Sequence, residues 1–388
     1  MRPISKHLAR KLSHLTQTST TNTLIRQHIN VSQLYKRWKG AIVSRGLACF
    51  IFLHATMNEE PSRTDLLESS GSTIQQLRAA LENKTGLHEP WTSGVITLPE
   101  SKATLFYERQ DGTASSLKLG SVTPAQANDL NPACTPATFG LNQQDVLDES
   151  YRKAGKLDAG KFAWLFNLCD FTSQLAAGLF PWSSLDKGIR FEPYKLNVYG
   201  EGSFFKAHQD TPRGADMFGS LVCLLPIAHE GGNLVLRHHG REFVFNGQAL
   251  LQNSPPASIS WVAFFSDIEH EVTRVTPGYR ATITYNLYFD SYIGPPPICQ
   301  TPTTIEHPFK TTLKKILEDP TTPTTHPILG FGLQHAYPFD RAIVDPDSIK
   351  LKGTDATLVQ ILKELGVSPQ FFLLYREDNE KDDCPFRV

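Results

Sequence analysis

The alternation of apolar and polar residues changes after Gly188, and from there to Asp290 it predicts a series of short strands. β-Branched and aromatic residues are concentrated in these runs, and turn residues such as Gly231-Gly232 separate them. Short strands at close spacing are typical of a sandwich or barrel. We therefore expect an all-β core over residues 189–290, a double-stranded β-helix (jelly roll) with flanking α-helices. The expected strands lie at 191–198, 220–225, 234–236, 242–245, 259–265 and 281–289.

The region before this core, residues 58–188, is expected to support it with helices. Apolar residues at helical spacing predict a helix from Phe162 to Leu179, and a second helix is predicted from Asp145 to Lys156. A strand is predicted at Thr104–Glu108, because β-branched and aromatic residues precede the turn signal Asp111-Gly112. We expect the helices to pack against the back of the sheet.

The region after the core divides into two parts. Residues 291–327 are rich in Pro and Thr, which is typical of a linker, and they enclose a predicted helix at Lys310–Glu318. Residues 328–388 form a carboxy-terminal extension with a strand-like segment at 328–333, a predicted helix at 356–365 and the apolar run 371–375. We expect this extension to be folded and to pack on the barrel or cover its mouth.

The amino-terminal extension, residues 1–57, contains no Asp or Glu and many scattered Arg, Lys, Ser and Thr. That composition is typical of an organelle transit peptide, and a disordered extension explains it equally well. The apolar stretch from Gly46 to Ala55 is too short to span a bilayer. We expect an intracellular protein, cytoplasmic or nuclear, or mitochondrial if the extension is a transit peptide.

Charge and cysteine content narrow the class of protein. The chain has 38 Lys and Arg against 39 Asp and Glu, so no overall positive charge indicates a nucleic-acid partner. The six cysteines are far apart and form no Cys-x-x-Cys pair. We interpret them as free thiols in a reducing compartment, and not as a disulfide framework or a structural zinc site.

Two histidines and a carboxylate within the predicted core have the composition of a metal site. His208 and Asp210 are two residues apart, so at a strand end their side chains point to one face. His270 lies on a later predicted strand and is placed to complete a set of three ligands. Two His and one carboxylate form the facial triad of non-haem Fe(II) oxygenases, in which up to three metal positions stay open.

A nearby arginine and tyrosine are suited to a dicarboxylate. Arg280 lies ten residues after His270, on the last predicted core strand. Its planar guanidinium is suited to bidentate binding of a distal carboxylate. Tyr199, nine residues before His208, is placed to add a hydroxyl to the same carboxylate.

Residues 190–290 resemble the prolyl 4-hydroxylase-type family of 2-oxoglutarate and Fe(II)-dependent dioxygenases. The resemblance implies that His208, Asp210 and His270 ligate iron, that Arg280 binds the distal carboxylate of 2-oxoglutarate and that Tyr199 hydrogen-bonds to it. It also implies Fe(II), 2-oxoglutarate and O2 as cofactor and cosubstrates, with ascorbate as a further candidate. The matching motifs are Tyr199-Gly200, His208-x-Asp210, Gly231-Gly232-x-Leu234 and His270-x-Val272-x-x-Val275-x-x-Gly278-x-Arg280.

The activity implied by this resemblance is hydroxylation of an unactivated C–H bond, with release of succinate and CO2. A peptidyl proline is the leading candidate substrate. A small-molecule (secondary-metabolite) 2-oxoglutarate oxygenase is the alternative enzyme, and a non-catalytic jelly-roll binding module is the alternative from another class. We expect a peptide or small-molecule partner, and neither a nucleic acid nor a membrane.

Other polar residues of the core are interpreted as structural. Arg274 and Arg280 have the Arg-x5-Arg spacing of nucleic-acid dealkylases, but no arginine follows Arg280 within the strand, so we interpret Arg274 as a surface residue. Asp267 and Glu269 are expected to be solvated turn residues or partners of His270. His335 is expected to be structural. The histidines near the Gly231-Gly232 turn are expected to be exposed, and the adjacent His238 and His239 to point apart; the set is His229, His238 and His239.

Overall fold

A computed structural model describes residues 48–53, 77, 79–80, 89–141, 144–166, 168–181, 188–214, 216–290, 307–318, 329–337, 349–367, 369–376 and 386–387. The chain divides into two compact units. The larger comprises Leu53–Leu329 and Gln334–Pro369, and the smaller comprises Met1–Phe52, Gly330–Leu333 and Gln370–Val388. Most of the amino-terminal extension and the Pro/Thr-rich segment lies outside the described residues, and the five-region division stays a prediction.

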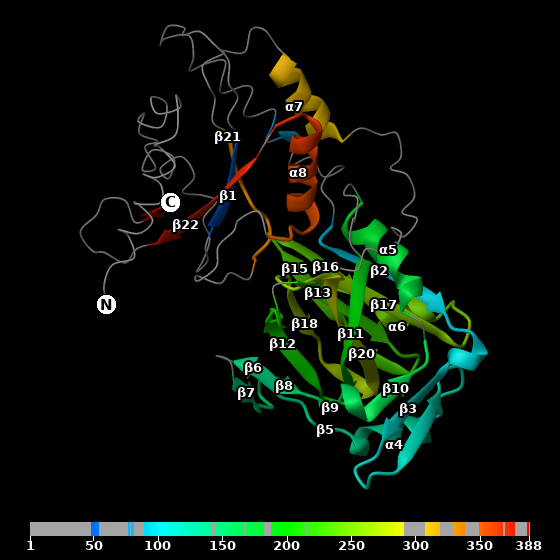
Figure 1. Cartoon of the computed structure of the whole chain (residues 1–388). Coiled ribbons are helices and arrows are strands. Elements are labelled where there is room, and N and C mark those ends of the chain that lie inside the picture. Colours follow the sequence, from blue (N-terminus) through cyan, green and yellow to red (C-terminus); the bar gives the residue numbers. More distant parts are fainter. Residues whose placement is uncertain are drawn as a thin grey trace, which may run out of the picture. The chain divides into compact units, whose positions relative to one another are not determined.

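The larger unit contains a seven-stranded antiparallel sheet, the major sheet, in the order β2-β17-β13-β20-β11-β9-β5 (Figure 1). Four of the strands predicted from the sequence form its centre, at β11, β13, β17 and β20. The strands are β2 (Trp91–Thr97), β5 (Thr135–Pro136), β9 (Gly155–Asp158), β11 (Gly188–Tyr199), β13 (Met217–Leu224), β17 (Ser258–Phe265) and β20 (Arg280–Asp290).

A five-stranded minor sheet, in the order β16-β15-β18-β12-β8, faces the major sheet. Contacts between side chains of the two sheets show this packing. Arg152 Nη2 donates a hydrogen bond of 2.7 Å to Asn197 Oδ1, and the rings of Phe264 and His270 lie 4.8 Å apart. The predicted jelly-roll core is confirmed. The minor-sheet strands are β8 (Arg152–Lys153), β12 (Phe204–His208), β15 (Leu234–His238), β16 (Arg241–Phe245) and β18 (Glu269–Val272).

The two faces of the major sheet differ in polarity. One row of directly paired residues on its outer face is apolar and buried, and it consists of Leu196, Ile283, Cys223 and Trp261. The neighbouring row faces the minor sheet and includes Asn197, Thr282 and Ser260. Because side chains alternate between the faces of a strand, the sheet has an apolar back and a partly polar interior face.

Helix α5 (Cys169–Leu179) packs on the apolar back of the major sheet and lies next to β2 (Figure 1). Phe171, Leu175 and Leu179 repeat every four residues and are fully buried. The ring of Phe171 meets the edge of Trp261 at a centroid distance of 5.5 Å. Helical support of the back of the sheet is therefore as expected.

The predicted helix at Asp145–Lys156 is wrong. These residues form the end of β7 (Gln144–Val146), then β8, then the start of β9. Lys153 pairs with Phe204 of the minor sheet, and Gly155 pairs with Val198 of the major sheet. Pairing with two existing sheet edges overrode a weak local helical preference.

The predicted helix at Phe162–Leu179 is correct only from Cys169 onward. Phe162 and Trp164 belong to β10 (Phe162–Trp164), which pairs with β3 (Thr104–Glu108), the strand predicted there. Aromatic residues recur at every second position in this stretch, which is a strand period and not a helical one.

Shorter elements complete the larger unit. Helices α7 (Pro308–Glu318) and α8 (Gly353–Glu364) confirm the two predicted near 310–318 and 356–365. Helix α4 (Pro124–Ala133) is not predicted above. The remaining elements are η1 (Glu100–Lys102), β4 (Ala114–Lys118), β6 (Phe139–Leu141), η2 (Ala159–Lys161), β14 (His229–Gly231), α6 (Gly247–Leu251) and β19 (Val275–Gly278).

The smaller unit contains a four-stranded sheet in the order β21-β1-β22-β23. Strand β1 (Ala48–Leu53) comes from the apolar stretch near the amino terminus and pairs antiparallel with β22 (Gln370–Arg376). The sheet also includes β21 (Leu329–Gly332) and β23 (Phe386–Arg387).

Across the described residues, no helix combines the length and the apolar character that crossing a bilayer requires.

Candidate metal centre and cosubstrate pocket

His208, Asp210 and His270 converge at one end of the minor sheet. His208 ends β12 and lies directly opposite His270 of β18, and Asp210 follows two residues after His208. One ligand atom from each residue lies within 4.8 Å of the other two. His270 Nε2 is 3.8 Å from Asp210 Oδ1, and the two imidazole centroids are 4.2 Å apart. The structure thus brings together the three predicted ligands.

A register shift in the β12–β18 ladder directs His208 toward this point. The shift falls between Phe205 and His208, and such irregularities turn a side chain relative to its strand. The Phe205 ring then stacks on the His208 imidazole at 3.6 Å between centroids. The ring of Phe264, from the major sheet, packs against the His270 ring at 4.8 Å between centroids.

Backbone carbonyls fix the orientation of both imidazoles. His208 Nδ1 lies 2.8 Å from Lys206 O, and His270 Nδ1 lies 3.0 Å from Ile268 O. Because a carbonyl oxygen only accepts, each Nδ1 carries the proton and each Nε2 keeps a free lone pair. Such partners are the usual means of orienting a metal-binding histidine.

The carboxylate is held in the same way. Ser220 Oγ, from β13, donates a hydrogen bond of 2.5 Å to Asp210 Oδ2, which leaves Oδ1 on the His270 side. Burial, with a further contribution from His270, lowers the pKa of His208 well below its ordinary value, so the ring is neutral at physiological pH. Neutral imidazole and ionised carboxylate are the states that bind a metal ion.

A polar track runs along the interior face of the major sheet from the triad to Arg280. Arg280, Thr282, Thr284 and Asn286 alternate along β20 and share one face. Asn286 pairs with Ser220, the residue bonded to Asp210, and Arg280 pairs with Tyr199 at the other end. Asn286 Nδ2 is buried without a hydrogen-bond partner among the described residues. An interior lined in this way is suited to a polar ligand.

Two buried arginines enter this interior without a carboxylate partner in the described part of the chain. Arg280 is only 3% exposed, and its guanidinium lies over the Tyr199 ring at 5.3 Å. Burial lowers the pKa of Arg280, which reflects the cost of an uncompensated charge. Arg152 is 6% exposed, and its hydrogen bonds go to two uncharged oxygens, Asn197 Oδ1 and Thr138 O. Because buried cations are costly without an anion, a dianion such as 2-oxoglutarate fits this interior.

Tyr199 is buried beside Arg280, as the last residue of β11. The structure places its ring against the guanidinium. A role for its hydroxyl on the cosubstrate carboxylate stays a prediction.

Several functional candidates were missed by the sequence interpretation. Ser220, Asn286 and Arg152 carry no motif, and only the strand register places them on the interior face. Arg152 also falls within the segment predicted wrongly as a helix. Arg152 lies between Tyr151 and Lys153, so no alternation of apolar and polar residues marked it in the sequence.

The remaining polar residues are placed as follows. Arg274 is exposed, as expected, and donates to Gly202 O. His229 is buried, contrary to expectation, because its Nδ1 is satisfied by Ile227 O. His239 is exposed, as expected, and its φ is +47°. Its ring centroid lies 4.1 Å from that of His238, so the two rings do not point apart. The side chain of His238 is only 9% exposed. Asp267 is not solvated, since its side chain is 9% exposed and ion-paired.

A comparison with known protein families matches one segment of the chain to a family. The profile of the 2OG-Fe(II) oxygenase superfamily matches residues 194–288. This segment includes Tyr199, His208, Asp210, His270 and Arg280. No curated protein sequence matches the chain.

Solved structures similar to this chain include three oxygenases. A prolyl-4-hydroxylase from Pseudomonas putida is 19% identical, with 55% of this chain and 98% of that chain covered and a TM-score of 0.30. A Trichoplax adhaerens prolyl hydroxylase, in complex with a hypoxia inducible factor oxygen degradation domain peptide fragment, is 15% identical, with coverage of 58% and 95% and a TM-score of 0.32. A 2OG-Fe(II) oxygenase family oxidoreductase from Burkholderia pseudomallei is 16% identical, with coverage of 61% and 94% and a TM-score of 0.26.

The family match and the geometry concern the same residues. The matched segment supplies the central strands of the major sheet, four strands of the minor sheet, the His-Asp-His cluster and the buried arginine at the end of the polar track. Fe(II), 2-oxoglutarate and O2 are the cofactor and cosubstrates that this family implies. Residues 194–288 are a 2OG-Fe(II) oxygenase superfamily domain, and the chain is a 2-oxoglutarate- and Fe(II)-dependent dioxygenase.

Proposed function

We propose that this dioxygenase hydroxylates an unactivated C–H bond of a peptide, with a peptidyl proline as the leading candidate. The observation that carries the chemistry is Arg280, a buried cation with no carboxylate partner among the described residues, at the end of the track that begins at the triad. The candidate substrate rests on the motif resemblance to prolyl 4-hydroxylases.

The residues of the chain have separate roles in this proposal. His208, Asp210 and His270 would hold the iron ion through two imidazoles and one carboxylate. When bound, the iron would activate O2, one oxygen atom of which enters succinate as 2-oxoglutarate loses CO2 while the other enters the hydroxylated substrate. Arg280 orients the distal carboxylate, and the buried interior face of the major sheet excludes water from the cosubstrate.

The exposure of the ligands indicates where the substrate approaches. The side chain of His270 is 9% exposed, whereas that of Asp210 is 27% exposed. The metal centre is therefore open on the side of Asp210 and closed on the side of His270. An opening beside a metal ligand is compatible with a peptide that lies across the rim, and it also admits a small molecule.

The experiment measures succinate release from 2-oxoglutarate by the full-length chain with Fe(II) under air. We expect turnover to depend on iron and to rise with a peptide from a proline-containing library. If small molecules stimulate succinate release and peptides do not, the substrate is a small molecule and not a peptide. Absence of both succinate release and 2-oxoglutarate binding would contradict the proposed chemistry.

The variant His208→Ala separates the enzyme from a binding module. An oxygenase loses succinate release while staying folded, whereas a module that only binds a partner keeps that binding. Arg274→Ala is a matched control, because Arg274 is exposed and lies outside the metal cluster.

A further inference from the structure

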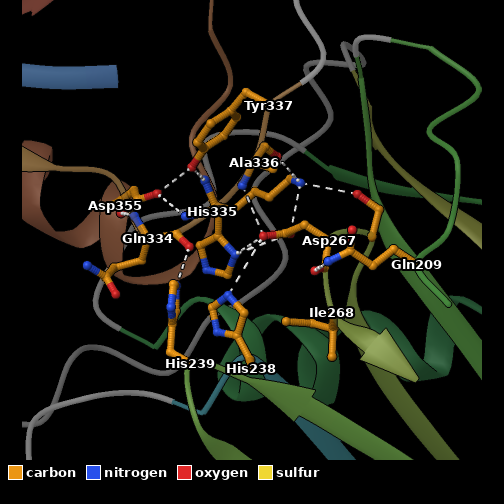
Figure 2. A network of polar contacts seen from close by, with 12 residues as sticks. Gln209, His238, His239, Asp267, Ile268, Gln334, His335, Ala336, Tyr337 and Asp355 are labelled. Atoms are coloured by element: carbon orange, nitrogen blue, oxygen red, sulfur yellow. Dashed lines mark hydrogen bonds and ion pairs between the residues drawn. The ribbon is translucent and has the colours of Figure 1, made fainter. Parts of the chain in front are cut away.

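A buried polar network joins the carboxy-terminal part of the larger unit to the turn that precedes His270 (Figure 2). The turn, residues 266–268, connects β17 to β18. The carboxy-terminal part comprises residues 334–337 and 352–355, which we call the latch. Asp267 is the residue of the turn on which most of these contacts converge, and its side chain is 9% exposed.

Three donors from the latch surround the Asp267 carboxylate. His335 Nδ1 lies 3.1 Å from Oδ2, and the backbone N–H of Ala336 donates to the same oxygen at 3.0 Å. Lys352 Nζ donates to Oδ1 at 3.2 Å, and also to Ser266 Oγ and Ala336 O. His335 is 3% and Lys352 2% exposed at the side chain, so these contacts are shielded from water.

The latch is itself held together by a second buried carboxylate. Asp355, in the first turn of α8, accepts hydrogen bonds from the backbone N–H groups of Gln334 and His335 and from the hydroxyl of Tyr337. The backbone N–H of Lys352 donates to the same hydroxyl at 2.9 Å. Contacts within the latch therefore fix the donors that meet Asp267 relative to one another.

Backbone carbonyls of the same turn contact His270 directly and contact the segment of the other two predicted iron ligands through Gln209. The carbonyl of Ile268 accepts the hydrogen bond from His270 Nδ1 that sets the direction of that ring. The carbonyl of Asp267 accepts a 2.8 Å hydrogen bond from the side-chain amide of Gln209, which lies between His208 and Asp210 in the sequence. Any shift of residues 267–268 thus moves the partners of both ligand segments.

We infer that the latch is a positioning element of the metal centre and that Asp267 is its positioning residue. By holding the Asp267 carboxylate, the latch fixes the carbonyls that orient His270 and the Gln209 loop. The inference rests on the proposed function, because it assumes that the triad binds iron. Loss of an outer partner of a metal ligand typically weakens metal binding by about 10- to 100-fold.

The network also offers a second arrangement, in which His238, Asp267 and His335 themselves bind a metal. One ligand atom from each lies within 4.8 Å of the others. The contacts of Asp267 favour the ion pair, because Lys352 Nζ already supplies a cation to Oδ1 and His335 Nδ1 lies within 3.3 Å of both oxygens. Like charges repel at this range, so a divalent ion would have to displace the ammonium.

The test compares full-length wild type, Asp267→Asn and the matched control Glu269→Gln. Both substitutions remove one carboxylate near His270, but Glu269 is exposed whereas Asp267 is held by the latch. Mn(II) affinity is measured by the EPR signal of free Mn(II), and the ligand field is measured by the visible absorption of Co(II)-loaded protein. We expect one metal equivalent for wild type, a dissociation constant about 10- to 100-fold higher with an altered Co(II) spectrum for Asp267→Asn, and wild-type values for Glu269→Gln.

A second variant, Lys352→Gln, removes the cation from the latch side and leaves residues 266–270 intact. We expect it to weaken Mn(II) binding in the same direction, and circular dichroism establishes that each variant is folded. Folded Asp267→Asn and Lys352→Gln proteins that bind Mn(II) as wild type does would overturn the positioning role and leave the proposed function standing.

Two further outcomes are distinct from these. Wild type that binds no Mn(II) overturns the proposed function itself and, with it, the role of the latch. Wild type that binds two equivalents, one of which is lost in His335→Ala, overturns the ion-pair arrangement in favour of a metal at His238, Asp267 and His335.

Discussion

At the residue scale, Arg280 determines what the interior can bind. Its guanidinium is buried and has no carboxylate partner among the described residues, so an anionic ligand gains the full effect of that charge. Replacement by Lys keeps the charge but removes the bidentate fork. A charge-assisted hydrogen bond contributes about 1.5–3 kcal/mol, so we expect Arg280→Lys to raise the KM for 2-oxoglutarate by about 10- to 100-fold. Succinate release at varied 2-oxoglutarate measures this change.

Arg274→Lys is the control for that experiment. Arg274 is exposed and its guanidinium donates to the carbonyl of Gly202, so its substitution is expected to leave the KM unchanged. An equal effect of the two substitutions would mean that Arg280 does not contact the cosubstrate.

Ser220 supports a second prediction at this scale. Its hydroxyl is buried and donates to Asp210 Oδ2 at 2.5 Å, so Ser220→Ala frees the carboxylate to rotate. We expect a loss of Mn(II) affinity of about 10-fold, the lower end of the effect of removing an outer partner. Equilibrium dialysis against Mn(II) measures it.

Ser260→Ala is the matched control for Ser220→Ala. Ser260 is also a buried serine on the interior face, but its Oγ has no partner among the described residues. Removal of an unsatisfied hydroxyl is nearly neutral, so metal affinity should not change. If Ser260→Ala weakens binding as much as Ser220→Ala does, the bond to Asp210 is not the cause.

Individual site residues were predictable from the sequence when chemistry and spacing acted together. His208 and Asp210 lie two apart at a strand end, and Arg280 lies on a strand of clear β composition. Ser220 and Asn286 were not predictable, because a serine and an asparagine in apolar strands have no distinctive spacing. Their role depends on register, which directly pairs the two residues across β13 and β20.

At the element scale, the turn between β14 and β15 shapes the pocket of Arg280. Gly232 has φ of +62°, and a Cβ there would lie 2.8 Å from both Arg280 Cδ and Val275 Cγ2. Gly232→Ala therefore combines backbone strain with displacement of the arginine. We expect a loss of about 1–3 kcal/mol in the free energy of unfolding and weaker 2-oxoglutarate binding. Urea unfolding and calorimetric titration measure the two effects.

Gly240→Ala separates strain from displacement. Gly240 has φ of +76°, but a Cβ there would meet no atom within 4 Å. It should therefore lose stability through strain alone and keep its affinity for 2-oxoglutarate. Equal loss of affinity in both variants would contradict the claim that Gly232 makes room for Arg280.

Elements with a strong internal signal were predicted from the sequence, and elements that depend on distant partners were not. The central strands β11, β13, β17 and β20 are rich in β-branched and aromatic residues, and each was predicted. Strands β8 and β9 are short and form only at the edges of sheets built by other segments.

Helix α4 had a readable signal that the sequence interpretation did not use. Thr123 and Gln126 form a capping box, and Pro124 occupies the first turn. This combination marks a helix start even where the apolar pattern is weak.

At the scale of the whole molecule, the sequence predicted a folded carboxy-terminal extension but not its contacts. Lys352 and His335 lie 85 and 68 residues from Asp267, and the ion pairs among them depend on the completed jelly roll. Asp267 was expected to be either a solvated turn residue or a partner of His270. Its burial follows from a segment that no local pattern places there.

The buried network should determine part of the way in which the stability of the larger unit changes at acidic pH. Burial, with a contribution from His335, lowers the pKa of His238 to about 3. The folded protein therefore keeps this ring neutral while the unfolded chain takes up a proton below about pH 6.5, and stability falls as pH decreases between these values.

For Asp267, burial alone would raise the pKa, but the hydrogen bond and charge of His335 and the charge of Lys352 lower it. Its contribution is present above about pH 3.9 and is lost below it.

Between pH 6.5 and pH 4, His238 should therefore contribute to the slope of stability against pH, as should His208 and His229, whose pKa values burial also lowers, whereas Asp267 should not. One buried neutral histidine contributes up to about 1.4 kcal/mol per pH unit, so His238→Gln should flatten the fall in unfolding free energy by up to that amount. Urea unfolding at half-unit steps of pH measures the slope. His239→Gln is the control, because the neighbouring His239 is exposed and should leave the slope as in wild type. Parallel curves for His238→Gln and wild type would show that His238 is protonated in the folded protein, and the ring would then be an ion-pair partner of Asp267, 3.9 Å away.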